Sequence, residues 1–312
     1  MTRSRSAFGF PIGTGVFGLI LIGIVCAIGI VLTLESMASI RRFGWHFLWT
    51  DRWDPVAGEF GAVPFLWGTF YSSLLAIVVA APVALGMAIF MSEFCPEVLR
   101  EPLAFVTELL AAIPSIVYGL WGMFVLVPAV RTLERLTPDA LRGTPLFSGS
   151  PIGLGMLTAG LLLAVMVVPF VAVVLRTVLA SVPAAQRDGA YALGATHFEA
   201  VRASLSYARS SIAGAILLGV GRALGETMAV TMVIGNSTGT SWSLFAPQYT
   251  MAAVIVNEFT EAADELHFAA LVEIGLLLFV VTLVVNLLSR RLISSMNRRA
   301  RAAAVAPAQA PA

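Results

Sequence analysis

An arginine and a glutamate inside an apolar run are the residues of this chain with the clearest potential for chemistry. Arg222 and Glu226 lie within residues 212–235, which carry no other charged residue. Counted along a helix with a rise of 1.5 Å per residue, Arg222 lies about 15 Å into the run, near the middle of a bilayer. Glu226 follows one turn later on the same helical face. We therefore expect the two side chains to lie together at membrane depth.

A charge at that depth costs at least about 2.5–3.5 kcal/mol, and such residues usually mark a path for a polar or charged substrate. A single arginine would suit an anionic substrate. The alternative is a purely structural ion pair within one helix. The order of arginine before glutamate at i, i+4 is the weaker one for such a pair, which favours the path over the structural pair.

The elements that position these residues are predicted by composition. Apolar residues make up 58% of the 312 residues and charged residues 12%, with a mean hydropathy of +0.90, whereas soluble domains have about 45–50% and about 25%. We therefore expect an all-α integral membrane protein. Six stretches reach the length of about 20 residues that a membrane helix needs: residues 13–34, 68–91, 105–130, 152–175, 212–235 and 269–288.

The basic residues predict the orientation of these spans. All nineteen are arginine. With the N-terminus inside, twelve fall in cytoplasmic segments and six in outer loops, a positive-inside bias that places both termini in the cytoplasm. We divide the chain into a cytoplasmic N-terminal tail (1–12), a six-helix membrane domain (13–295) and an Ala/Pro-rich C-terminal tail (296–312) that we expect to be disordered.

The absence of lysine from the sequence excludes whole classes of chemistry. A P-loop needs its lysine on the phosphates, and Schiff-base or pyridoxal chemistry needs an amine. If ATP powers this protein, another chain must bind it. Cys26 and Cys95 belong to no CxxC or Cys/His cluster, so we expect neither a metal nor a cofactor in this chain.

Two features of the third apolar run could contribute to a path. Glu108 lies within about one turn of its start, from where it could also simply reach the membrane interface. Pro114 interrupts the helix just before Ser115. We expect a kink there; the alternative is a broken helix whose second half turns its N-terminal dipole toward an anion.

The segment of about residues 177–208, between the fourth and fifth runs, is too polar for a span. Proline at 183 is typical of a first helical turn, and apolar residues then recur at helical spacing, with charged residues such as Arg187 and Asp188 opposite them. We expect a short amphipathic helix and a bend near Gly194. Such a helix could lie on lipid headgroups or dock a partner protein.

The outer loops are too long for bare turns. Residues 35–67 are rich in tryptophan and phenylalanine, and residues 237–267 are acidic. An aromatic belt at the membrane interface is one interpretation of the first loop. A docking surface for an external partner is the other.

Several motifs resemble those of a known family. Residues 182–196 (VPAAQRDGAYALGAT) resemble the EAA loop of ABC importer permeases. Three stretches resemble the phosphate importer permeases: residues 219–230 (GVGRALGETMAV), 108–122 (ELLAAIPSIVYGLWG) and 64–73 (PFLWGTFYSS). The tryptophan-rich first outer loop is similar to that of the C-type subunit of this system.

The resemblance implies a type I ABC importer permease fold, with six transmembrane helices and a cytoplasmic coupling helix between the fourth and fifth. It implies residues needed for phosphate passage, Arg222 and Glu226, with Glu108, Pro114 and Ser115 as further candidates. It also implies a coupling surface that docks in a cleft of the ATPase, formed by Arg187, Asp188, Gly189, Ala190, Leu193 and Gly194.

The partners that the resemblance implies are a homologous A-type permease in a heterodimer, two copies of an ATPase that carries ATP and Mg²⁺, and an extracytoplasmic phosphate-binding protein. The location would be the bacterial plasma (inner) membrane, and no nucleic acid is expected as a partner. The sequence departs from the family pattern at Asp188-Gly189-Ala190, where Glu-Ala-Ala is usual, and at Ser206, where proline is usual. A glycine there would loosen the coupling helix.

Rival functions differ in what they require. A permease for sulfate or molybdate is the nearest, although a glutamate acceptor disfavours a fully deprotonated dianion. A secondary anion transporter or channel would need no docking helix, and paired inverted repeats of broken helices are not evident. An intramembrane enzyme would need a motif such as HExxH or GxSxG, and the sequence has neither.

Overall fold

The computed structural model describes the backbone of residues 6–305 and the side chains of residues 14–295. This part of the chain is helical, with two isolated β-bridges. The helices are α1 Ser6–Glu35, α2 Met37–Phe43, α3 Val63–Ile89, α4 Glu97–Ala112, α5 Ser115–Trp121, α6 Val127–Leu136, α7 Asp139–Arg142, α8 Met156–Ala180, α9 Ala184–Ala192, α10 His197–Leu224, α11 Met228–Thr231, α12 Met251–Glu258 and α13 Glu265–Val305. A 3₁₀ turn, η1, covers Gly44–Leu48, and π-helical turns η2 and η3 cover Phe90–Phe94 and Gly122–Leu126.

Six helical segments of the described chain are long and apolar enough to cross a membrane, which confirms the predicted class and number of spans. They are Thr14–Glu35, Val63–Phe94, Ser115–Leu136, Met156–Ala180, His197–Leu224 and Glu265–Ser295. Helix extends into both predicted tails, since α1 begins at Ser6 and α13 continues to Val305. The remaining tail residues, 1–5 and 306–312, lie outside the described residues.

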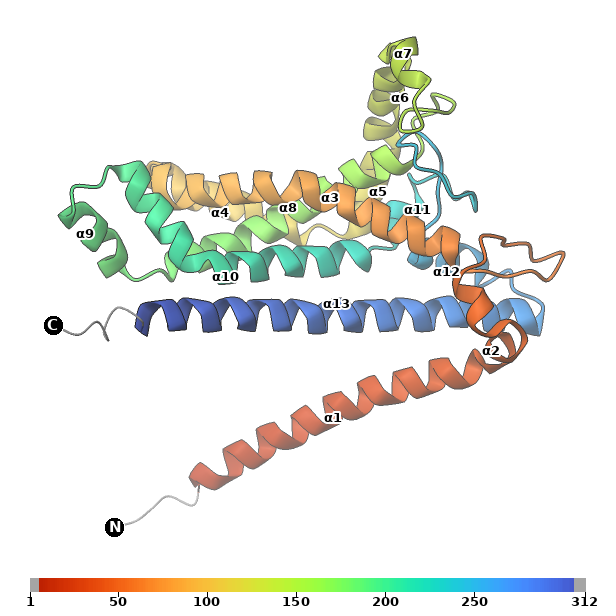
Figure 1. Ribbon diagram of the computed structural model, residues 1–312, viewed down its shortest axis with the longest axis horizontal. Coiled ribbons are helices and arrows are strands. Elements are labelled where there is room, and N and C mark those ends of the chain that lie inside the picture. Colours follow the sequence, from red (N-terminus) through yellow and green to blue (C-terminus); the bar gives the residue numbers. More distant parts are fainter. Residues whose placement is uncertain (1–5, 306–312) are drawn as a thin grey trace.

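Helix α8 is the centre of the bundle, with α3, α4 and α10 packed around it (Figure 1). In its apolar window, 61% of the residues are buried, compared with none in α1. Along α3, a stripe of fully buried alanines, Ala76, Ala80, Ala84 and Ala88, recurs every four residues. Small side chains at this spacing let two helix backbones approach closely in a membrane, and α3 therefore packs on α8 along much of its length.

Two of the predicted runs are broken where the sequence analysis expected continuous helix. Between α4 and α5, Ile113 and Pro114 have extended backbones with ψ of 131° and 138°. The expectation of a kink is thus wrong: proline lacks an N–H and forces the residue before it out of the helical region. The fifth run, expected to continue to residue 235, instead ends at Leu224, and a short helix, α11, follows.

The chain ends and the amphipathic helix share one end of the molecule. In Figure 1, α1 begins and α13 ends on the side that carries α9, whereas α2, α12 and the long loops gather at the opposite end. Helices α6 and α7, which follow α5 in the chain, project away from the side of the bundle (Figure 1). This arrangement separates an end formed by α9 from an end formed by loops.

A close approach between α3 and the loop before α12 gives a test of the packing. A Cβ on Gly68 would collide with the backbone carbonyl of Tyr249, whereas a Cβ on Gly86, in the same helix, would meet no described atom within 4 Å. We expect Gly68→Ala to lower the free energy of unfolding by about 1–3 kcal/mol. The matched Gly86→Ala should leave it unchanged or raise it by about 0.5–1 kcal/mol. Thermal unfolding of the purified protein in detergent measures both, and equal midpoints would contradict this packing.

Candidate functional site: a charged break and an exposed helix

Arg222 lies in the last turn of α10, half-buried among apolar helices. Its guanidinium carbon lies 5.0 Å from the centre of the Phe170 ring on α8, within the range of a cation–π contact. Its Nε is buried and has no hydrogen-bond partner among the described residues. The arginine therefore keeps a donor for a group that the chain itself does not supply.

Glu226 does not lie beside Arg222 on a helical face, as the sequence suggested, because α10 ends before it. Its Oε1 accepts a hydrogen bond of 3.2 Å from the backbone N–H of Ala229 at the start of α11. Within the described residues, Glu226 and Arg222 form no ion pair. The structural pair considered above is thus not formed, and the carboxylate caps the short helix instead.

The break between α4 and α5 is stabilised by a residue that the sequence analysis missed. The hydroxyl of Tyr118 donates a hydrogen bond of 2.8 Å to the carbonyl of Leu110, near the end of α4. Its i+4 neighbour is Pro114, which has no N–H to donate, so the carbonyl accepts a long hydrogen bond of 3.3 Å from the Ile113 N–H in addition to the one from Tyr118. The signal in the sequence was a hydrogen-bonding aromatic one turn after the proline.

The two breaks lie against each other, because α5 packs on α11. Gly119 makes this possible: a Cβ there would lie 2.6 Å from the sulfur of Met232 and 3.1 Å from the Cα of Ala229. Arg222 lies just before one break, and Tyr118 lies just after the other. The structure therefore brings Arg222 and Glu226 to the same region as the helix that Ser115 begins.

Glu108 belongs to a different pair. Its carboxylate lies 2.8 Å from Nη2 of Arg176 on α8, with the glutamate side chain about half exposed. The charge of Arg176 therefore compensates this glutamate. No local pattern in the sequence linked the pair, because Glu108 lies on α4 and Arg176 lies on α8.

Helix α9 is the predicted amphipathic helix, and it stands apart at one end of the bundle (Figure 1). The predicted bend is confirmed, because Gly194 has a φ of +82°, a conformation that favours glycine. Leu193 beside it is 91% exposed. Helix α10 then begins at once with a capping box between Thr196 and Glu199.

The departures from the family motif do not interrupt these helices. Asp188 and Gly189 lie within α9, and Ser206 lies within α10. Both side chains, Asp188 and Ser206, are exposed. The helix therefore forms through the glycine that was expected to loosen it.

Arg187 points toward the bundle, although the sequence placed it on the charged outer face of α9. Its Nη2 lies 2.7 Å from Oε1 of Glu93, whose side chain is only 6% exposed. Glu93 comes from η2, at the end of α3, and no sequence pattern linked it to α9. This ion pair attaches α9 to the membrane helices, whereas Leu193 and Gly194 remain free to contact a partner.

At the opposite end, the first outer loop divides into buried and exposed aromatics. Phe47, Phe60 and Trp53 are at most 8% exposed and form a small core, whereas Trp45 and Trp49 are 82% and 79% exposed. The indole N–H of Trp53 donates a hydrogen bond of 2.8 Å to the Glu258 carboxylate. This bond connects the loop of residues 35–67 to the loop of residues 237–267. Half of the large rings of the loop thus lie inside a folded cap, and the exposed Trp45 and Trp49 are the ones that could contact the membrane interface or a partner.

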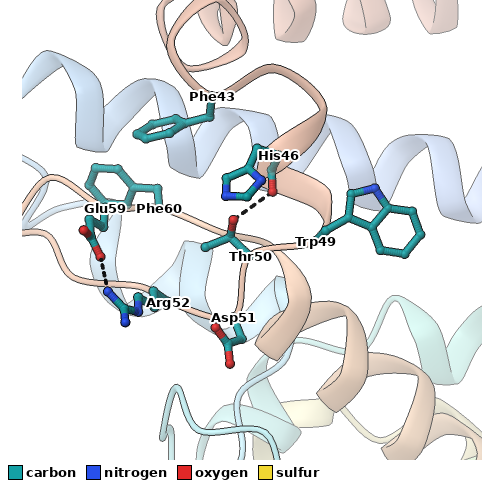
Figure 2. Close-up of a pocket in the computed structure, with 8 residues that line it drawn as sticks. All are labelled: Phe43, His46, Trp49, Thr50, Asp51, Arg52, Glu59 and Phe60. Carbon is teal, nitrogen blue, oxygen red and sulfur yellow. Dashed lines mark hydrogen bonds and ion pairs between the residues drawn. The ribbon is translucent and has the colours of Figure 1, made fainter.

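The cap contains a surface pocket of about 460 Å³. Figure 2 shows that its wall is the turn after η1, where the Thr50 hydroxyl donates to the His46 carbonyl at 2.8 Å. Arg52 and Glu59 pair at 3.4 Å along one side, and the Trp49 ring points away from them. Charged and aromatic groups thus meet on a concave outer surface. Among the described residues, no cluster of His, Cys, Asp or Glu could hold a metal ion.

Comparisons with known proteins agree with these features. The model of the family described as "binding-protein-dependent transport system inner membrane component" matches residues 80–301. Proteins named phosphate transport system permease protein PstC are similar along most of the chain. The one from Haemophilus influenzae is 44% identical over 96% of this chain and 98% of its own. PstC from Mesorhizobium japonicum is 42% identical over 90% and 87%, and PstC 1 from Mycobacterium tuberculosis is 39% identical over 86% and 87%.

A solved structure shares the fold. The MetNI methionine ABC transporter in an inward-facing conformation has a chain that matches with a TM-score of 0.53 and 17% sequence identity. The match covers 75% of this chain and 94% of the MetNI chain. At this identity the likeness concerns the fold alone.

The separation of Arg222 from Glu226 can be tested with double-mutant cycles. Because the two side chains share no hydrogen bond or ion pair, Arg222→Gln and Glu226→Gln should have additive effects on the free energy of unfolding, within about 0.5 kcal/mol. The matched cycle combines Arg187→Gln with Glu93→Gln. Because these two residues form an ion pair and the Glu93 carboxylate is buried, this cycle should show a coupling energy of about 1–3 kcal/mol. Denaturant unfolding of the purified variants measures both cycles. Strong coupling in the first cycle would instead support a structural ion pair between Arg222 and Glu226.

Proposed function

The chain belongs to the family of binding-protein-dependent transport system inner membrane components, and from this premise we propose that the Arg222 guanidinium binds inorganic phosphate as the anion crosses the membrane. The protein is a permease subunit of an ABC phosphate importer, a multi-pass protein of the inner membrane. It is not an enzyme, because separate subunits of such transporters hydrolyse ATP. An ATPase and a substrate-binding protein are its partners.

One observation carries the role of Arg222: its guanidinium is half-buried, has an unpartnered Nε and faces no carboxylate of the described chain within ion-pair distance. In a low-dielectric environment, this charge would stabilise an anion far more than it would in water. Charge-assisted hydrogen bonds to phosphate oxygens would add to this. The helix break beside Arg222 supplies irregular backbone, which membranes tolerate where it lines a cavity.

Glu226 has a different task in this proposal. Because its carboxylate caps α11, it holds the helix that packs against α5, and a free carboxylate oxygen could accept a hydrogen bond from a protonated phosphate. Pro114 and Ser115 define the other side of the break. Glu108, which is paired with Arg176, contributes to the path only if that pair opens. Sulfate and molybdate permeases are not favoured, because the similar proteins named above are phosphate permeases.

We place α9 and both termini in the cytoplasm. The excess of arginines in the segments at that end supports this orientation, as does the position of α9 beside the start of α1 and the end of α13. The further partners in this proposal are an A-type permease and two ATPase copies, which bind ATP and Mg²⁺; the chain itself binds no cofactor. The phosphate-binding protein would dock on the outer cap.

In this arrangement, the exposed end of α9 contacts the ATPase. Leu193 is 91% exposed, far more than a leucine in a folded core, and Phe198, four residues past Gly194, is 70% exposed. Exposed apolar side chains next to each other mark a protein interface. Asp188, Gly189 and Ala190 belong to the same docking surface, whereas Arg187 fixes the helix from behind.

Phosphate uptake by variants of Arg222 tests the path. Arg222→Gln should abolish uptake into proteoliposomes that contain the assembled transporter, because the anion would enter a low-dielectric path without a compensating charge. The matched Arg209→Gln, on an exposed position of α10, should transport normally. Complex yield serves as the control for folding. Normal uptake by a well-assembled Arg222→Gln would exclude this role.

A charge at the tip of α9 tests the coupling. Leu193→Glu should reduce ATP hydrolysis stimulated by the loaded binding protein at least about tenfold, because it buries an unpaired carboxylate in the docking interface. Gln186→Glu introduces the same charge in the first turn of α9 and should have a much smaller effect. If both variants hydrolyse ATP at the parental rate, α9 does not couple to the ATPase.

A further inference from the structure

A second charged cavity lies beneath α9, formed by η2, α4 and α8, with a volume of about 570 Å³. Its polar lining comes from Ser92, Arg100, Arg176, Thr177 and Arg187. The cavity lies within the range of about 300–1,000 Å³ that small-molecule sites occupy. Its three arginines come from three different helices, so the fold gathers positive charge at one place.

The carboxylates nearby do not compensate this charge fully. Arg176 pairs with Glu108 and Arg187 pairs with Glu93. Arg100 forms no ion pair within the described residues, and its Nη2 makes only a long hydrogen bond of 3.4 Å to the Cys95 carbonyl. The lining of the cavity thus includes three arginines and no carboxylate, and one of these arginines, Arg100, has no ion-pair partner among the described residues.

Two buried donors at the cavity have no partner in the described part of the chain. They are Nε of Arg187 and the hydroxyl of Ser92. Arg187 contacts Glu93 through Nη2, and the Nε–H on the same edge of its planar guanidinium has no partner. Buried donors without partners are unfavourable, and native structures usually satisfy them.

We propose that this cavity binds an oxyanion of the phosphate class, held by the guanidinium groups of Arg100 and Arg187, which line it. Arginine offers donors in a rigid fork that matches phosphate oxygens, and several such bonds converge here. The anion compensates the charge of Arg100, which has no ion pair within the described residues. Its source is either free inorganic phosphate or the phosphate of an anionic lipid headgroup.

Binding at this place has a consequence for α9, which rests on the proposed coupling function. The anion and the Glu93 carboxylate compete for the Arg187 guanidinium, and this guanidinium is the attachment of α9 to the bundle. An occupied cavity therefore weakens the Arg187–Glu93 pair. In the proposed orientation the cavity faces the cytoplasm, so the concentration of transported anion on that side would act on the coupling helix.

The experiment measures binding of radiolabelled inorganic phosphate to the assembled transporter in phosphatidylcholine nanodiscs, without nucleotide or binding protein. All variants carry Arg222→Gln, which removes the charge of the proposed path. Arg100→Gln should weaken phosphate binding by roughly tenfold, because it removes charge-assisted hydrogen bonds without leaving an unpaired carboxylate. The matched control Arg202→Gln, exposed on α10, should bind as the parent does.

A second variant changes affinity in the opposite direction. Glu93→Gln removes the competitor for Arg187 and should strengthen phosphate binding several-fold, whereas a merely structural role for Glu93 would lower binding or leave it unchanged. An unchanged or weakened affinity in a well-assembled Glu93→Gln complex overturns the competition between the anion and Glu93.

Nanodiscs that contain phosphatidylglycerol distinguish the two sources. If the ligand is a lipid headgroup, native mass spectrometry should detect retained phosphatidylglycerol that Arg100→Gln releases and Arg202→Gln keeps. If neither phosphate nor lipid responds to Arg100→Gln, the site does not exist. Because the Arg222→Gln background is used throughout, this result is independent of whether Arg222 carries phosphate, which only the uptake assay decides.

Discussion

Backbone groups that leave a helix at membrane depth must be enclosed by protein, since lipid offers no hydrogen-bond partners. The rest of this structure depends on that constraint. Its two interrupted helices break at Pro114 and after Leu224, and the short helices that follow, α5 and α11, pack on each other. Tyr118 satisfies a carbonyl freed by one break, and Glu226 satisfies an N–H at the start of α11. The same enclosure leaves Arg222, in the last turn of α10, half-buried beside the second break.

Charged residues at the two ends of the bundle have the opposite role, because they connect elements rather than line a path. The Arg187–Glu93 pair joins α9 to the end of α3, and Glu258 joins the two outer loops through Trp53. Between these ends, α8 and α3 pack through alanines that leave little room for movement. The closely packed α3 and α8 thus lie between one end that holds α9 and another that holds the cap.

The sequence predicted the parts of this structure that depend on local pattern. Long apolar runs predicted the six spans, and Gly194 with its polar surroundings predicted the short helix and its bend. The end of α10 could not be predicted, because residues 225–235 are apolar enough to continue a helix and only packing against α5 decides otherwise. Glu93 and Arg176 were missed for a similar reason: their partners lie 94 and 68 positions away in the chain, and no local pattern joins them.

Helix α1 packs chiefly against α13 and α2, and its apolar window has no buried residue. It precedes the other described spans in the chain, yet its principal neighbour is the last of them. The packing of α1 on α13 can therefore form only after every helix between them has been synthesised. The topology thus assigns α1 a late step in maturation, in which closing the chain, rather than inserting it, completes the subunit.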